Sequence, residues 1–163
     1  MTAVRDMIAT RRAIVAEARS WATPRTPFVH QARVKGVNGG VDCLQFVRAV
    51  GEAVGALSPV TKAEEKQFVR YYGRRPDPPH MRECLETFLV EIPAEEAAQG
   101  DITWTHWGND YPIHMALLAD YRGRETVIHS VYGHGVAEQG LSDVFRSRVV
   151  AYWRYPALDE VTL

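Results

Sequence analysis

Cys43 combines a reactive side chain with a position that could activate it. It directly follows Asp42, a residue type favoured at helix N-caps, and an apolar stripe of helical period begins immediately after it. In the first turn of a helix, unpaired backbone N–H groups and the positive end of the helix dipole favour a thiolate. The same N–H groups can hold the oxyanion formed when sulfur attacks a carbonyl. We therefore predict a nucleophilic thiol, and the competing interpretation is a small buried core residue.

Two histidines in strand-like segments could supply the base for this thiol and the group that orients the base. His114 lies in PIHMALLAD and His129 in ETVIHSVY. A turn centred between Tyr121 and Arg122 would place the two imidazoles directly opposite each other. A turn centred between Arg122 and Gly123 would make them diagonal neighbours on one face. An intermediate register would put them on opposite faces, so the site requires one of the first two registers. The competing interpretation is that each histidine is a half-buried strand residue with its own hydrogen-bond partners.

Other catalytic chemistries have weaker signals in this sequence. No Cys-x-x-Cys or His-x-x-x-His pair occurs, so a zinc site would need scattered ligands drawn from Cys43, His106, His114, His129 and His134. The absence of a Gly-x-Ser-x-Gly motif disfavours a serine hydrolase. We therefore predict no metal and no cofactor. Four aromatic residues flank the predicted site and are expected mainly to pack: Trp104, Trp107, Tyr111 and Tyr132.

Length and composition predict one globular domain over residues 1–163, because 46% of the residues are hydrophobic and 24% are charged. With 19 Lys and Arg against 20 Asp and Glu, the formal net charge of −1 disfavours a nucleic-acid partner. No segment approaches the roughly 20 apolar residues of a membrane span. Residues 1–12 lack the apolar run of a secretory signal, so we expect synthesis in the cytoplasm without a signal peptide. Cys43 and Cys84 are then expected to be free thiols.

Helical patterns precede strand patterns along the chain. The apolar spacing predicts helices over 6–22, from Asp42 to about Ser58, and from Thr61 to Gly73. Another is predicted to begin at Asp77, with Met81, Leu85, Phe88 and Leu89 on its inner face. Residues 23–41 are expected to form a loop. From Asp101 onward the apolar runs are short and rich in β-branched and aromatic residues: ITWTHW, PIHMALLAD, ETVIHSVY and VVAYWRY. This order predicts an α+β fold in which N-terminal helices pack on an antiparallel sheet.

The order of these segments resembles the NlpC/P60 cysteine peptidases, and most closely their phage-type branch encoded in tail gene clusters and gene transfer agents. The matching segments are TPFVHQARVKG (26–36), GGVDCLQFVRAV (39–50), QGDI (99–102), IHMALL (113–118), VIHSV (127–131) and AYWRYP (151–156). The resemblance spans 8–156 and is loose over 58–98. It implies a papain-like core with Cys43 as nucleophile, His114 as general base and His129 as the orienting residue.

The resemblance also implies a function and partners. It favours a cysteine peptidase that hydrolyses peptide stems of bacterial peptidoglycan, carried on a phage tail or tail-like particle beside other tail or baseplate proteins. One alternative is a structural tail-tip or assembly protein that keeps the fold with little turnover. Another is an intracellular thiol acyltransferase or amidase on the same core.

The sequence departs from the pattern of the family in three ways. Leu44 and Gln45 follow the cysteine where Ser-Gly is usual, and the bulkier Leu44 is expected to narrow the cleft. Phe28 matches a loop tyrosine but has no hydroxyl to donate. Gln99 stands where proline is common before Gly-Asp. Leu44 and Phe28 are the features that favour the structural alternative.

Overall fold

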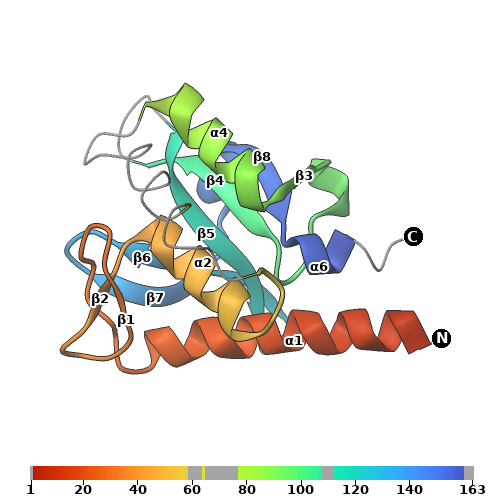
Figure 1. The fold of residues 1–163 in the computed structure, drawn as a ribbon, viewed down its shortest axis with the longest axis horizontal. Coiled ribbons are helices and arrows are strands. Elements are labelled where there is room, and N and C mark those ends of the chain that lie inside the picture. The colour runs from red at the N-terminus through yellow and green to blue at the C-terminus, as the bar shows by residue number, and fades with distance from the viewer. Residues whose placement is uncertain (1, 59–63, 65–76, 108–111, 160–163) are drawn as a thin grey trace.

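The computed structural model describes residues 2–58, 64, 77–107 and 112–159, and it has the expected α+β architecture (Figure 1). Its helices are α1 (Thr2–Ala22), α2 (Cys43–Ala53), α4 (Pro78–Phe88), the 3-10 helix η1 (Ala94–Glu96), α5 (Asp143–Ser147) and α6 (Pro156–Asp159). A two-stranded antiparallel sheet is formed by β1 (Arg33–Val34) and β2 (Gly40–Val41). In Figure 1 the long α1 runs along one side of the molecule, next to α2.

The main sheet has six antiparallel strands in the order β3-β8-β4-β5-β6-β7. The strands are β3 (Val90–Ile92), β4 (Ile102–His106), β5 (Pro112–Tyr121), β6 (Arg124–Val131), β7 (Gly135–Gly140) and β8 (Val149–Arg154). The four strands expected from the sequence are β4, β5, β6 and β8. The strands β3 and β7, at the two edges, were not expected.

The helices differ from the sequence-based expectation at their ends. Helix α2 ends at Ala53 rather than near Ser58, because the chain turns at Gly55, which has a positive φ of 73°. The expected loop over 23–41 contains the β1–β2 hairpin. The helix expected from Thr61 to Gly73 lies outside the described residues. No helix in the described part of the chain is long and apolar enough to span a bilayer.

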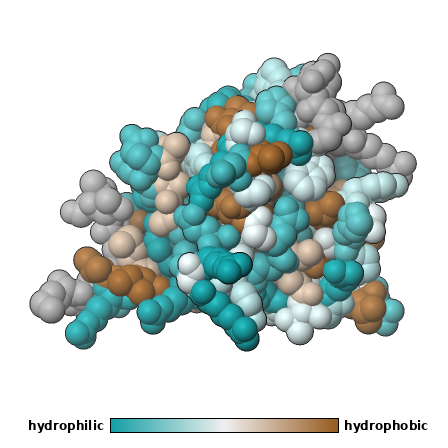
Figure 2. All heavy atoms as spheres, turned by 180° about the vertical axis from the view of Figure 1, so that it is seen from behind, coloured by the Kyte–Doolittle hydropathy of each residue, from teal (hydrophilic) through white to brown (hydrophobic). Residues whose placement is uncertain are grey.

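Alternation along the strands divides the buried side chains between two faces of the main sheet. On one face, Met115, Leu117 and Ile128 belong to the main core, which also includes side chains from α1, α2 and α4. On the other face, a small cluster packs under Phe145 of α5 and consists of Ala116, Leu118, Val127 and Phe145. Figure 2 shows the molecule from behind, where apolar side chains lie in separate small groups among polar ones.

The β5–β6 hairpin has the diagonal register that the sequence allowed. Its pairs run from Tyr121–Arg124 to Leu117–Ile128, and the turn residues Arg122 and Gly123 have positive φ values of 51° and 77°. Two positive φ values in a two-residue loop are typical of a type I′ turn, whose twist matches that of the strands.

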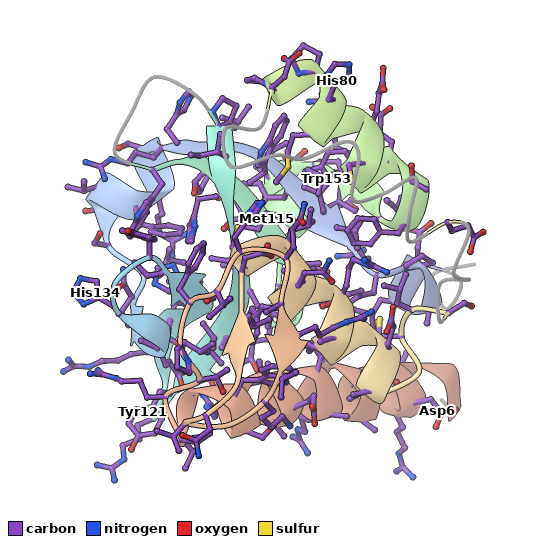
Figure 3. All side chains as sticks on the ribbon, turned by 60° about the vertical axis from the view of Figure 1, so that its left-hand side comes forward. Asp6, His80, Met115, Tyr121, His134 and Trp153 are labelled. Atoms are coloured by element: carbon purple, nitrogen blue, oxygen red, sulfur yellow. The ribbon has the colours of Figure 1, made fainter. Side chains whose placement is uncertain are left out.

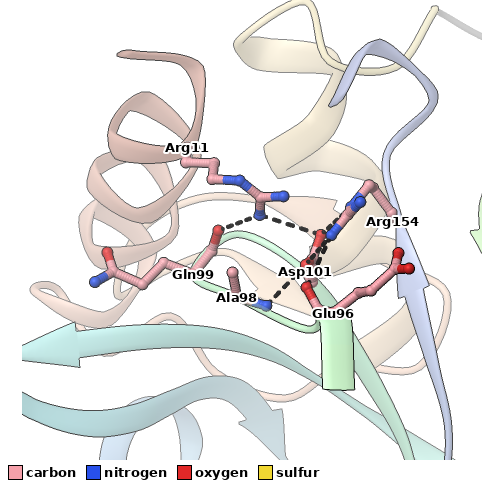
Figure 4. A network of polar contacts seen from close by, with 6 residues as sticks. All are labelled: Arg11, Glu96, Ala98, Gln99, Asp101 and Arg154. Carbon is pink, nitrogen blue, oxygen red and sulfur yellow. Dashed lines mark hydrogen bonds and ion pairs between the residues drawn. The ribbon is translucent and has the colours of Figure 1, made fainter. Parts of the chain in front are cut away.

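Asp101, directly before β4, connects three parts of the fold (Figure 4). Its buried carboxylate accepts hydrogen bonds from Nε and Nη2 of Arg154 on β8, both at 3.0 Å. It also accepts from the backbone N–H of Ala98 at 2.9 Å, and Arg11 of α1 forms an ion pair with it at 3.2 Å. Arg11 donates in addition to the carbonyl of Gln99 at 2.6 Å. This carboxylate therefore fixes α1 and β8 to the turn that starts β4.

We predict that Asp101→Asn lowers the free energy of unfolding by about 3–5 kcal/mol, because it leaves the buried Arg154 guanidinium without its counter-charge. Urea denaturation at pH 7 measures this change. The matched control is Glu86→Gln, which removes an exposed ion pair with Arg82 and should cost less than about 1 kcal/mol. Equal effects of the two variants would show that the Asp101 network does not stabilise the fold.

Candidate active site

Asp42 fixes the beginning of α2 and therefore the position of Cys43. One carboxylate oxygen accepts a hydrogen bond from the backbone N–H of Gln45 at 2.8 Å, which is the N-cap bond expected from the sequence. The other accepts from the backbone N–H of Gln31 at 2.6 Å. The buried Asp42 thus joins the preceding loop to the helix, and Cys43 is the first helical residue.

The Cys43 thiol lies beside the backbone of β5, next to His114. Its Sγ lies 3.8 Å from the carbonyl oxygen of Ile113, to which it donates, and the backbone N–H of Met115 also faces it. Figure 3 shows Met115 where β5 passes the beginning of α2. The pairing of β5 with β6 ends at Leu117, while β5 begins at Pro112. The sulfur therefore lies beside the first residues of β5, the strand that carries His114. Its hydrogen bond goes to the β5 main chain rather than to the imidazole.

The two strand histidines form a hydrogen-bonded pair. Nε2 of His114 lies 2.7 Å from Nδ1 of His129, and both side chains are buried. Trp107, just after β4, lies over the His114 ring at 4.7 Å between centroids and meets His129 edge-on at 5.3 Å. Phe145 of α5 contacts the His129 ring at 6.2 Å. The predicted pairing of the imidazoles is confirmed, and two aromatic side chains pack against the buried pair.

Burial determines the charge of the two imidazoles. It lowers the pKa of His114 well below 6.5, and the neighbouring His129 lowers it further. Burial likewise lowers the pKa of His129 to about 4, although the Gln139 side chain acts in the opposite direction. Both rings are therefore neutral at pH 7.

The Cys43 thiol is also neutral, contrary to the expectation from the helix start. Burial raises its pKa to about 12, and the negative charge of Asp42 adds to this effect. The backbone N–H groups of Met115, Leu44 and Cys43 lower the pKa, but by less. The effect of desolvation on the pKa of Cys43 is larger than that of the N–H groups at the helix start. The prediction of a thiolate in the resting protein is therefore wrong.

Two further sequence-based expectations concern residues near the cysteine. The Leu44 side chain is 1% exposed and packs in the main core, so the expectation that it narrows the cleft is wrong. The ring of Phe28 meets Tyr132 edge-on at 5.7 Å. Gln99 is exposed, and its carbonyl serves as the acceptor for Arg11, as suits a residue in a local turn.

The remaining candidate residues are the second cysteine, the aromatic residues near the predicted site and the possible metal ligands. Cys84 is buried in α4 and, like Cys43, is a free thiol. Trp104 is buried in the main core, whereas Trp107, expected mainly to pack, contacts both imidazoles. Tyr111 lies outside the described residues. Within the described ranges, no three His, Cys, Asp or Glu side chains come together as metal ligands would.

Comparisons with known proteins support the fold. No family model and no curated protein matches this sequence. The search of solved structures does find matches, among them a protein of Staphylococcus aureus subsp. aureus Mu50 described as similar to a lipoprotein of the NLP/P60 family. It is 16% identical, with a TM-score of 0.56 over 90% of this chain. The chain has the fold of an NLP/P60 family protein. It spans 41% of the length of that protein.

A second solved structure is the NlpC/p60 domain of the peptidoglycan hydrolase SagA. It is 22% identical, and the alignment covers 87% of this chain and 96% of that domain with a TM-score of 0.49.

The raised pKa of Cys43 predicts slow alkylation of the resting protein. Because only the thiolate reacts, iodoacetamide at pH 7 should modify Cys43 about 1,000-fold more slowly than an ordinary thiol, and the rate should still rise above pH 9. The measurement uses the Cys84→Ala variant, so that Cys43 is its only cysteine, with the same protein in denaturant as the reference. A rate that is already maximal between pH 5 and 7 would instead indicate a preformed thiolate–imidazolium pair.

Proposed function

We propose that this chain is a cysteine peptidase that hydrolyses the peptide stems of bacterial peptidoglycan. One observation carries the proposal: the Cys43 thiol lies beside the main chain at His114, whose ring is hydrogen-bonded to His129. A nucleophile, a base and a group that orients the base are the parts that covalent acyl transfer requires. The substrate class is supported by the resemblance of the segments around these residues to NlpC/P60 peptidases.

The pairing of the imidazoles assigns a role to each ring nitrogen. Nε2 of His114 is engaged by His129, so Nδ1 of His114 remains as the atom that can take a proton. A bare Nδ1 requires the proton of His114 to be on Nε2, where it is donated to Nδ1 of His129. In this arrangement His129 orients the base and keeps it in the active tautomer.

The neutral resting state determines the order of the acylation step. Cys43 attacks the amide carbonyl carbon as its proton moves to Nδ1 of His114, forming the C–S bond and an oxyanion. The resemblance to the family implies that the Cys43 backbone N–H, at the free end of α2, holds that oxyanion. The imidazolium then gives its proton to the leaving amine as the C–N bond breaks, which leaves a thioester.

Hydrolysis of the thioester completes the cycle. Water attacks the thioester carbonyl while Nδ1 of His114 accepts its proton, and the C–S bond then breaks. The proton returns from His114 to the sulfur, so the enzyme ends in the neutral state from which it began. Because Trp107 and Phe145 shield the pair from water, the attraction between the imidazolium and the oxyanion is strong when the two charges appear together.

We also propose that the protein is carried on a phage tail or tail-like particle, in contact with other tail or baseplate proteins. Support comes from the sequence alone, whose matching segments resemble the phage-type branch of the family. A particle would bring to the cell wall a protein that is made in the cytoplasm.

A structural tail-tip or assembly protein with the same fold is the second candidate. The raised pKa of Cys43 and the missing hydroxyl at Phe28 favour it. Leu44, directed into the core, does not contribute to this alternative.

Digestion of purified peptidoglycan tests the peptidase proposal. We expect the wild-type protein to release new amine and carboxyl ends, and Cys43→Ala and His114→Ala to reduce the rate at least about 1,000-fold. Cys84→Ala and the exposed His134→Ala serve as matched controls and should stay within about twofold of wild type. A wild-type protein that releases no new ends would favour the structural candidate.

Purified particles from the encoding strain test the particle proposal. Mass spectrometry of tails banded on a density gradient should detect the chain at a constant ratio to the tail proteins. Particles carrying Cys43→Ala should contain the same amount, since the substitution removes only the sulfur of a half-buried side chain. A chain found only in the unbound fraction would contradict association with a particle.

A further inference from the structure

His129 has a second ring nitrogen that the pairing with His114 does not use. Nε2 of His129 is buried and makes no hydrogen bond to any residue that the structure describes. A buried N–H group without an acceptor costs about 1–3 kcal/mol, and buried polar groups in native proteins are nearly always paired. In the tautomer that the mechanism requires, this nitrogen carries the proton and therefore needs an acceptor.

The sheet register places an amide next to this nitrogen. Gln139 on β7 pairs with Val127, so it is a diagonal neighbour of His129 on the same face of the sheet. The alternation of side chains supports this placement, because the neighbouring Glu138 points to the other face and binds Arg19 of α1 at 2.8 Å.

The Gln139 side chain is exposed and acts on the ring of His129. It raises the pKa of His129, against the effect of burial, as a carbonyl oxygen facing a ring N–H does. An exposed amide can rotate to improve this contact, whereas the buried ring is fixed by His114.

We propose that Gln139 is a positioning residue whose side-chain oxygen accepts a hydrogen bond from Nε2–H of His129. Its catalytic consequence rests on the proposed peptidase function, but the contact itself does not. The contact selects one of two tautomers. With Nε2–H bonded to Gln139, Nδ1 of His129 is bare and accepts from Nε2–H of His114, which leaves Nδ1 of His114 free to take the thiol proton. In the other tautomer Nδ1 of His129 is the donor, the proton of His114 lies on Nδ1, and His114 cannot act as a base.

Kinetics of two Gln139 variants test the consequence. Gln139→Ala should lower kcat about tenfold and leave KM within about twofold, because the tautomer affects the chemical step rather than substrate binding. Gln139→Glu keeps an acceptor and should restore most of kcat, while its negative charge raises the pKa of His129 and moves the acidic limb of the pH profile to higher pH. The matched control is Gln99→Ala, the same substitution at an exposed position, and it should change neither kcat nor the pH profile.

Nitrogen-15 NMR of the histidine rings tests the contact without any substrate. In the wild-type protein the shifts should show a protonated Nε2 and a bare Nδ1 at His129, and in Gln139→Ala the protonated Nδ1 form should become populated. A His129 tautomer that is identical in wild type and Gln139→Ala would overturn the proposal. If the wild-type protein cleaves no peptidoglycan, the peptidase proposal fails, and the NMR result still decides the role of Gln139.

Discussion

The register of the β5–β6 hairpin is the constraint on which the site depends. A two-residue turn at Arg122 and Gly123 sets this register, and the register places His114 and His129 on one face, where their rings share a 2.7 Å hydrogen bond. A shift by one residue would carry one ring to the opposite face, into the main core. A catalytic base with an orienting partner requires the hydrogen bond between His114 and His129.

Burial has two opposite consequences at this site. The packing of Trp107 and Phe145 holds the imidazoles in place, and it also removes the water that would stabilise their charged forms. The same effect keeps the Cys43 thiol protonated. Neutral groups are the stable forms in a desolvated site, and in the proposed mechanism the opposite charges appear as a pair only when sulfur attacks a substrate.

Local signals in the sequence predicted the parts of the site that depend on local structure. Asp42 marked the start of α2, and the turn at Arg122–Gly123 limited the hairpin to registers of which one is observed. The charge of Cys43 could not be predicted, because it depends on burial by segments distant in sequence. Leu44 begins the apolar stripe of α2, and this periodicity already indicated a core position. The expectation that Leu44 narrows the cleft came instead from the resemblance to the family. Gln139 gave no signal, since the strand GVAEQG contains only one β-branched residue, Val136, and three of its six residues are glycine or alanine.

Intact-mass spectrometry after acid quenching tests the central claim most directly, because it detects the covalent intermediate. During turnover of a soluble peptidoglycan peptide, the wild-type protein should gain the mass of the acyl fragment. Peptide mapping should place this mass on Cys43 as a thioester that hydroxylamine removes. Cleavage of the peptide that proceeds with an acyl group on a different residue would contradict the account.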